Sequence, residues 1–261
     1  MIGAGYVINQ WDPDAGAFIN ASGIGGQEAY AVNTMVNVLK NVGIWNKFNF
    51  IYPFVGGNAN SHKFNLINPQ DTDAAFRITY GGTVNHSANG IQGDGTSGYC
   101  NTHLTPSACG GGQNDTHISL YCTVLPTARA GTDMGATTNQ AVSAIGMNLR
   151  NASNVFNTGV NNQTFGGVAN TTGGFFLITR TLSTEYRRYK NTTESTAVQT
   201  SATVSTTKMA ICAWNNNGTF QNFQDRTYGF ASAGFGLTAA ENNNLYNIVQ
   251  KFQSTLNRAV V

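Results

Sequence analysis

Apolar residues recur at three- and four-residue steps in one stretch near the start of the chain. From Gln27 to Val42 they form a continuous apolar face, because this spacing returns to the same side of a helix with 3.6 residues per turn. Gly43 then supplies a residue that readily ends a helix in the left-handed conformation. The pattern predicts a helix at about residues 27–42 that packs on a core, preceded by an N-terminal arm, residues 1–26.

A second helix is predicted at the end of the chain, at about residues 238–257. Thr238 and Glu241 have the spacing of a capping box, in which the Thr hydroxyl and the Glu carboxylate each accept a hydrogen bond from an otherwise free backbone N–H group. We expect the apolar stripe of this helix to dock on a sheet. The stripe consists of Leu245, Ile248, Val249, Phe252 and Leu256.

Between the helices, from about residue 62 to 235, the pattern changes to short apolar or alternating runs separated by Gly and Asn. Such runs are typical of strands, and their separators are typical of turns. Many short strands with little helix between them predict an all-β sandwich or jelly roll, with one domain over residues 27–261. The predicted strands are Ala75–Tyr80, Gly98–His103, His117–Val124, Ala144–Leu149, Gly174–Thr181, Glu185–Lys190, Thr196–Ser205, Lys208–Trp214 and Thr227–Ala233.

Charge excludes some classes of partner. Only 10% of residues are charged and the net charge is +2, whereas nucleic-acid binding needs clustered Lys and Arg. The one basic cluster, Arg187–Lys190, is interpreted as a strand end that faces solvent. The first residues lack the features of a signal peptide, and no apolar run approaches the roughly 20 residues of a membrane span. We therefore expect a chain that is made and retained in a cytoplasm, with neither nucleic acid nor membrane as a partner.

The cysteines and histidines do not predict a metal site. The four cysteines do not follow a zinc-motif spacing, and Cys100 with His103 offers two ligands where about four are needed. The DxDxDG run of a typical calcium-binding loop does not occur in the sequence. Free thiols in or near strands are the preferred interpretation, with a Cys100–Cys109 disulfide as the alternative. Neither a metal nor a cofactor is predicted. The remaining cysteines are Cys109, Cys122 and Cys212.

Catalytic patterns are also missing from the sequence. Glycoside hydrolysis needs two carboxylates at a fixed separation, and the ExDxxE pattern of related β-sandwich hydrolases does not occur. The GxGxxG match at Gly93–Gly98 is followed by a predicted strand, whereas a dinucleotide site needs a helix there. We interpret Gly93–Gly98 as a hairpin turn and predict that the chain is not an enzyme.

Several segments spread over nearly the whole chain match one protein family. They are Asp12–Ile24, Gly43–Gly57, Ser61–Arg77, Gly93–Asn101, Thr116–Tyr121, Ala213–Gly218, Thr227–Gly236 and Thr238–Arg258. They resemble, in the same order, a family of concanavalin A-like, LamG-type jelly rolls found in virion and tail-associated proteins of phages that infect Bacteroidota. Between about Arg129 and Thr171 the resemblance rests on pattern only. It implies a concanavalin A-like fold with an N-terminal and a C-terminal helix, and it carries over no catalytic residue. The cysteines are departures from the family and are given no family role.

The resemblance favours a structural or surface protein of a bacteriophage virion, such as a decoration, fibre or tail-associated protein. Its partners would be other virion proteins, and its place would be the virion, assembled in the host cytoplasm. Such proteins usually form closed symmetric homo-oligomers, so an oligomer, with a trimer as the specific guess, is expected. Trp11 and Phe18 are the candidate exposed aromatics for its interface.

The alternative is a glycan-binding module that attaches a particle to a host surface polysaccharide. Sugar sites combine an aromatic platform with amide side chains that hydrogen-bond hydroxyl groups. The competing interpretation is that Trp214 belongs to the core and the Asn run is a turn; exposure of the ring distinguishes the two. The candidate ligand-binding residues are Trp214, Asn215, Asn216 and Asn217, joined by Tyr99 and Tyr121 if the strands of these two tyrosines are neighbours.

Overall fold

The computed structural model describes residues 11–139 and 141–260. Its helices are α1 (Pro13–Ser22), α2 (Gly26–Asn41), α3 (Ala59–His62) and α4 (Ala239–Thr255), with 3-10 turns at Trp45–Lys47, Asp73–Ala75 and Pro106–Ala108. Its strands are β1 (Phe48–Tyr52), β2 (Thr79–Gly81), β3 (Val84–Ser87), β4 (Gly90–Gly93), β5 (Tyr99–Asn101), β6 (Thr116–Val124), β7 (Met134–Asn139), β8 (Ser143–Asn148), β9 (Val155–Val160), β10 (Gly166–Ala169), β11 (Gly174–Arg180), β12 (Glu185–Lys190), β13 (Thr193–Val198), β14 (Ala210–Ile211), β15 (Trp214–Asn216), β16 (Thr219–Gln221) and β17 (Thr227–Gly234).

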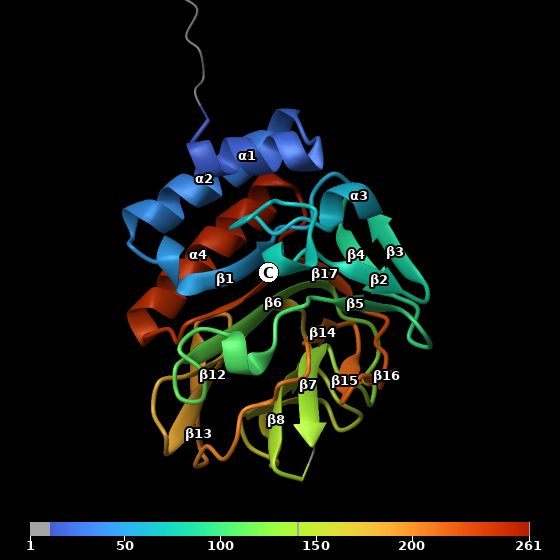
Figure 1. The fold of residues 1–261 in the computed structure, drawn as a ribbon, viewed down its shortest axis with the longest axis vertical. Coiled ribbons are helices and arrows are strands. Elements are labelled where there is room, and N and C mark those ends of the chain that lie inside the picture. The colour runs from blue at the N-terminus through green and yellow to red at the C-terminus, as the bar shows by residue number, and fades with distance from the viewer. Residues whose placement is uncertain (1–10, 140, 261) are drawn as a thin grey trace, which may run out of the picture.

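The described strands form two sheets that pack face to face (Figure 1). Sheet A has eight strands in the order β13-β12-β11-β6-β17-β4-β3, with β1 paired to β17. Sheet B has nine strands in the order β10-β9-β8-β7-β14-β5-β2, and the β15–β16 hairpin joins it at β7. Neighbouring strands are antiparallel except for β15 and β7, which run parallel. The predicted all-β sandwich is confirmed at the level of two packed antiparallel sheets.

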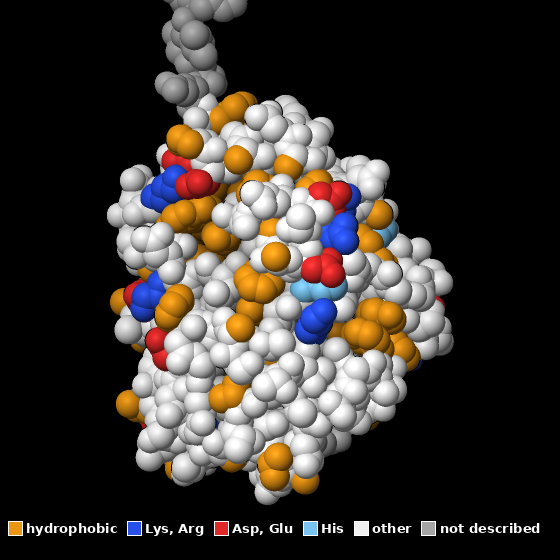
Figure 2. Space-filling model, in the orientation of Figure 1, with side chains coloured by type: hydrophobic (Ala, Val, Ile, Leu, Met, Phe, Trp, Pro, Cys, Tyr) orange, Lys and Arg blue, Asp and Glu red, His pale blue; other side chains and the backbone are white. Residues whose placement is uncertain are grey.

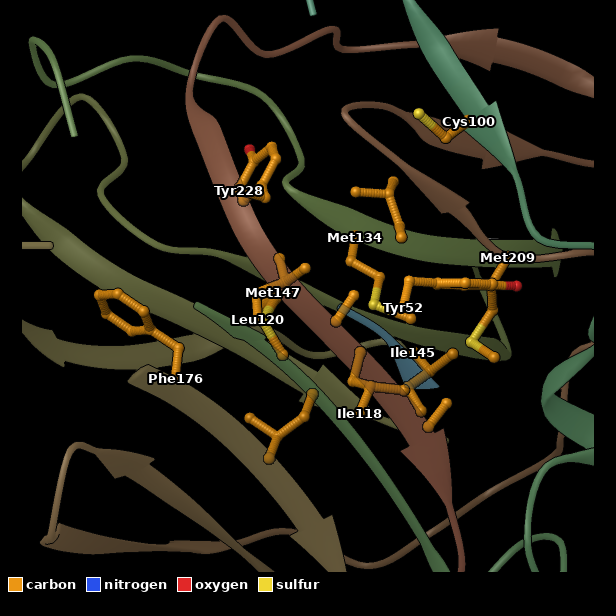
Figure 3. Packing of buried hydrophobic residues seen from close by; sticks show 14 of the residues in the cluster. Tyr52, Cys100, Ile118, Leu120, Met134, Ile145, Met147, Phe176, Met209 and Tyr228 are labelled. Atoms are coloured by element: carbon orange, nitrogen blue, oxygen red, sulfur yellow. The ribbon is translucent and has the colours of Figure 1, made fainter. Parts of the chain in front are cut away.

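The core between the sheets follows from alternation along each strand. Ile118 and Leu120 of β6 point from sheet A toward Met134 and Met147 of sheet B, as Figure 3 shows. The residue between Ile118 and Leu120 on β6 faces the opposite side of sheet A, because successive side chains in a strand alternate.

The outer face of sheet A is covered by a second core under the helices (Figure 1). Tyr121 of β6 and Phe175 of β11 lie there with the apolar faces of α2 and α4. Both helices lie within two residues of the predicted ranges, and the capping box of Thr238 and Glu241 is present at the start of α4. The sandwich therefore has a helical layer on sheet A.

The described part of the predicted N-terminal arm is instead a packed helix. Asp12 caps α1 by accepting a hydrogen bond from the Asp14 N–H group, and Lys40 of α2 lies 2.6 Å from the Asp12 carboxylate. Phe18 is 1% exposed, so its prediction as an exposed interface residue is wrong; Trp11 is half-buried. The arm's first ten residues lie outside the described residues.

Other predicted elements shift. The range Ala75–Tyr80 contributes only its last two residues to β2, and Thr196–Ser205 overlaps only the end of β13. Lys208–Trp214 divides between β14 and β15 because Cys212 adopts a positive φ of 67° between them. Gly93–Gly98 is a turn, but it joins β4 of sheet A to β5 of sheet B and so forms no hairpin.

The basic cluster Arg187–Lys190 does not simply face solvent. Arg187 points outward and pairs with Glu185 at 2.7 Å, whereas Arg188 is 7% exposed and points toward the interior of the sandwich. The prediction is wrong for Arg188 because its position on β12 has the same parity as the core residue Tyr186.

Uncharged polar groups form most of the surface on the face in Figure 2. Charged side chains occur there in a few small groups of mixed sign, separated by wide uncharged areas. The four cysteines are buried free thiols, as the preferred interpretation held.

The burial of His117 is expected to make the stability of the fold depend on pH. It is fully buried, with Nδ1 2.6 Å from the Phe235 carbonyl and Nε2 3.2 Å from the Ser232 hydroxyl. Burial lowers the pKa of His117 to about 4, against about 6.5 in an unfolded chain. The unfolded state therefore binds more protons between these two values, and native stability falls as the pH falls through this window.

From pH 7 to pH 4.5 this histidine should remove about 2 kcal/mol from the free energy of unfolding. Urea unfolding of the native chain and of His117→Gln at both pH values measures this loss. The variant should lose about 2 kcal/mol less than the native chain over this range. An identical pH dependence in the two proteins would show that His117 has no such role.

Candidate functional site

Trp214 lies on the outer face of sheet B, the face turned away from sheet A. Met134 of β7 and Met147 of β8 point into the core, so the adjacent residues Gly135 and Gly146 face outward. Trp214 pairs with Gly135, which in turn pairs with Gly146. The three residues therefore form one row across neighbouring strands.

The Trp214 ring packs against two glycines of sheet B. A Cβ atom on Gly146 would lie 2.6 Å from the indole, and one on Gly135 would lie 2.7 Å from it. The ring therefore rests directly on the backbone of sheet B, a close approach that only Gly allows. The ring of Phe165 stands edge-on to the indole, with centroids 5.8 Å apart and planes inclined at 72°.

The two rings border a cavity of about 260 Å³, which we call the Trp214 hollow. All its lining residues are uncharged. They are Gly131, Thr132, Met147, Asn148, Asn157, Gln163, Phe165, Trp214 and Asn222.

Three amide side chains in this hollow are free to bind a ligand. Asn157, Gln163 and Asn222 are half-buried or exposed, and their side chains make no hydrogen bond to another described residue. Asn148 differs, because its Nδ2 donates to the Arg129 and Gly131 carbonyls and its Oδ1 accepts from Arg226. Asn148 therefore supports the hollow, while the other three amides face its open space.

A second hollow of about 400 Å³ lies on the other side of the hairpin, and we call it the Phe220 hollow. The Phe220 ring stacks on Tyr99, with centroids 3.6 Å apart and planes inclined at 9°. Asn215 lines this hollow, but it is 3% exposed and its amide holds the backbone at Lys208 and Gly218. The other lining residues are Asn101, Thr207, Lys208, Asn217 and Gly218.

The structure divides the predicted site. Tyr99, Asn215 and Asn217 gather around the Phe220 hollow, while Trp214 points into the Trp214 hollow because adjacent strand residues face opposite ways. Asn216, the last residue of β15, is half-buried and lines neither hollow.

Tyr121 lies far from both hollows, so its predicted role is wrong. It sits on β6 in sheet A, under α4, and its hydroxyl donates to Gln250 at 2.9 Å. Tyr99 is in sheet B, so the two strands are not neighbours.

By the exposure criterion, the burial of Trp214 favours the competing interpretation over an exposed aromatic platform. The side chain is 4% exposed, and Asn217 and Gly218 do form the turn of the β15–β16 hairpin. The ring is nevertheless outside the core between the sheets and forms the floor of a polar hollow. The amides of that hollow were missed; the glycines at 135 and 146, within strands, were the available signal of a close approach.

No metal centre is built into either hollow. Across residues 11–139 and 141–260, no three His, Cys, Asp or Glu side chains are grouped to hold a metal ion.

Comparison with known proteins gives the fold alone. No family model and no curated protein matches the chain. Among solved structures, the binding domain of botulinum neurotoxin serotype D is 8% identical with a TM-score of 0.51, over 77% of this chain and 52% of that one. A Trypanosoma rangeli sialidase mutant with trans-sialidase activity is 9% identical with a TM-score of 0.50, over 85% of this chain and 39% of that one. Domain 4 of an arabinanase from Geobacillus stearothermophilus, in complex with arabinotriose, is 14% identical with a TM-score of 0.48, over 77% of this chain and 98% of that one. The chain thus spans about half of the toxin domain and two fifths of the sialidase.

Proposed function

We propose that this chain is a glycan-binding module that holds a neutral saccharide in the Trp214 hollow. The observation that carries the proposal is the set of three unpartnered amides beside an aromatic floor on the uncovered face of sheet B. Amide groups both donate and accept, which suits sugar hydroxyls. Aromatic rings offer the apolar C–H face of a sugar a matching surface.

The same hollow lacks the groups needed to cleave a glycosidic bond. Hydrolysis requires a pair of Asp or Glu side chains on either side of the bond, and none of the residues that line the Trp214 hollow is acidic. We therefore propose binding without catalysis.

Asn157→Ala tests the proposal. Loss of one net hydrogen bond of about 0.5–1.5 kcal/mol should weaken binding by roughly two- to twelvefold. The measurement is titration calorimetry with neutral tri- to hexasaccharides of glucose, xylose and arabinose. The matched control is Asn243→Ala, an exposed amide on α4 in the opposite layer.

Binding that is weakened in Asn157→Ala and unchanged in Asn243→Ala supports the site. If the two variants bind equally, or no neutral oligosaccharide binds the native chain, the proposal is wrong. The Asn157 side chain makes no hydrogen bond to another described residue and Asn243 is exposed, so both variants should fold like the native chain.

We also propose, from the family resemblance of the sequence, that the module has a concanavalin A-like topology and belongs to a bacteriophage virion. The resembling segments include Gly43–Gly57 and Thr227–Gly236, which build β1 and its partner β17, an interior strand of sheet A. Light scattering measures the mass of the purified chain. A closed homo-oligomer fits a virion component, and a monomer at all concentrations contradicts the oligomer.

A further inference from the structure

A cavity of about 440 Å³ lies where the two sheets separate at one edge of the sandwich, and we call it the edge cleft. Its size falls within the roughly 300–1,000 Å³ of small-molecule sites. It has two basic lining residues and no acidic one. The lining residues are Phe156, Val168, Ala169, Asn170, Thr171, Thr172, Arg188, Lys190, Thr193 and Ser195.

One wall of the edge cleft is a pair of cross-strand contacts in sheet A. Arg188 of β12 pairs with Ser195 of β13, and Lys190 pairs with Thr193. Each cation thus stands beside a hydroxyl group on the inward side of the same two strands. The opposite wall comes from the edge strand β10 of sheet B and its neighbour β9, through Val168 and Phe156.

Arg188 is buried with part of its hydrogen-bonding capacity unused. Its Nε donates to the Thr158 hydroxyl at 3.1 Å and its Nη2 to the Tyr186 hydroxyl at 2.9 Å. Among the described residues, Nη1 has no hydrogen-bond partner, and no carboxylate lies within 4.0 Å of the guanidinium. A buried cation is normally paired, because an unpaired one loses its hydration without compensation.

The other buried arginines have either a counter-ion or a fuller set of hydrogen bonds. Arg226 pairs with the Asp133 carboxylate, although its buried Nε has no hydrogen-bond partner. Arg180 donates to five backbone carbonyls, among them those of Val160 and Gln199. Among the buried arginines of the described residues, Arg188 thus combines an unpartnered Nη1 with the lack of a carboxylate partner, and its side chain lines a cavity.

Lys190 adds a second cation without a counter-ion. Its Nζ lies 4.8 Å from the centre of the Phe176 ring and donates to the Gly173 carbonyl. No described carboxylate forms an ion pair with it. Burial lowers the pKa of Lys190 to about 8, as expected for an ammonium group that lacks a neighbouring negative charge.

The remaining groups of the cleft fit a hydroxyl-rich molecule. The Ser195 hydroxyl is buried without a hydrogen-bond partner, and Thr172 and Thr193 add two more hydroxyls. Half-buried Val168 supplies an apolar surface opposite them. Two cations, three hydroxyls and an apolar wall together match a sugar ring that carries a carboxylate.

We propose that the edge cleft binds the carboxylate of an acidic sugar residue, with Arg188 and Lys190 as the charged ligands. The hydroxyls of Ser195 and Thr193 bind the sugar hydroxyls, and Val168 contacts the ring. This site is separate from the Trp214 hollow and does not depend on it.

The test compares methyl glucuronoside with methyl glucoside, which differ only in the carboxylate. Both are titrated into the native chain and followed by backbone amide NMR. The glucuronoside should shift the resonances of Lys190, Thr193 and Ser195 and bind about tenfold more tightly or better than the glucoside. Added NaCl should weaken it.

Arg188→Met should abolish this binding. Arg187→Met is the matched control, since it removes the same charge from the same strand but on the outward side, where Arg187 pairs with Glu185 and Glu194. Ser195→Ala provides a milder variant should Arg188→Met fail to fold, with a predicted weakening of roughly two- to twelvefold.

Equal binding of the two glycosides, an effect of Arg187→Met equal to that of Arg188→Met, or full competition by inorganic phosphate at the same concentration would each overturn the proposal. A chain that binds the glucuronoside but no neutral oligosaccharide would leave this inference standing and contradict the proposed function. A chain that binds a neutral oligosaccharide but not the glucuronoside would contradict this inference and leave the proposed function standing.

Discussion

Asp133→Ala is expected to lower the free energy of unfolding by about 3–5 kcal/mol, because it leaves the Arg226 guanidinium buried without its counter-ion. Both side chains are 0% exposed. The Asp133 carboxylate accepts from Arg226, from the Tyr228 hydroxyl and from the Leu149 N–H group at 2.7 Å. Burial by itself lowers the pKa of Arg226, but the Asp133 charge outweighs it, and the net effect raises that pKa.

Urea unfolding measures this loss. Asp225→Ala is the matched control, since Asp225 pairs with Arg129 at 3.1 Å in a partly exposed position and should contribute less than about 1 kcal/mol. Replacing both buried partners, as in Asp133→Leu with Arg226→Met, should recover part of the loss because no charge then stays unpaired. Equal losses for Asp133→Ala and Asp225→Ala would mean that the buried pair has no special role.

Arg258→Met is expected to destabilise the chain by at least about 3 kcal/mol, because several charged hydrogen bonds of roughly 1.5–3 kcal/mol each are lost together. Arg258 follows α4 and is 6% exposed. Burial lowers its pKa to about 10. Its guanidinium joins the end of α4 to three separate segments by donating to the carbonyls of Pro53, Phe54, Ala88 and Gly229.

The same unfolding measurement tests Arg258→Met, with the exposed Lys251→Met on α4 as the control. The control should change stability by no more than about 0.5 kcal/mol. A loss in Arg258→Met no larger than in the control would show that the carbonyls find other partners and that Arg258 does not fasten α4 to the sandwich.

Local signals predicted much of the fold. The apolar periodicity of α2 and the capping box of α4 depend on residues within one or two turns, so the sequence alone locates them. The missed helix α1 carried a local signal too, since Asp12 followed by Pro13 is a typical helix start.

The arrangement of the candidate site depends on contacts between distant positions. Trp214 rests on Gly135 and Gly146, which are far from it in sequence, and only the pairing of β15 with β7 brings them together. Tyr99 and Tyr121 looked equivalent in the sequence, but they belong to different sheets. Sequence patterns give the strands but not the sheet to which each strand belongs.

The inward direction of Arg188 was hidden for a different reason. Charged residues in strands usually face solvent, and a run of three basic residues in four suggested an exposed end. Only the parity of β12, set by Tyr186 in the core, turns Arg188 into the sandwich.

The most direct test of the central claim is to follow the indole N–H resonances of the native chain by NMR during titration with neutral oligosaccharides. The chain contains three Trp residues, so three such signals are expected. Trp11 and Trp45 pack near the helices on sheet A, whereas Trp214 lines the Trp214 hollow on sheet B. A saccharide that binds is expected to shift the Trp214 signal and to leave the other two in place. A saccharide that binds while the Trp214 signal stays unchanged would contradict the proposed glycan site.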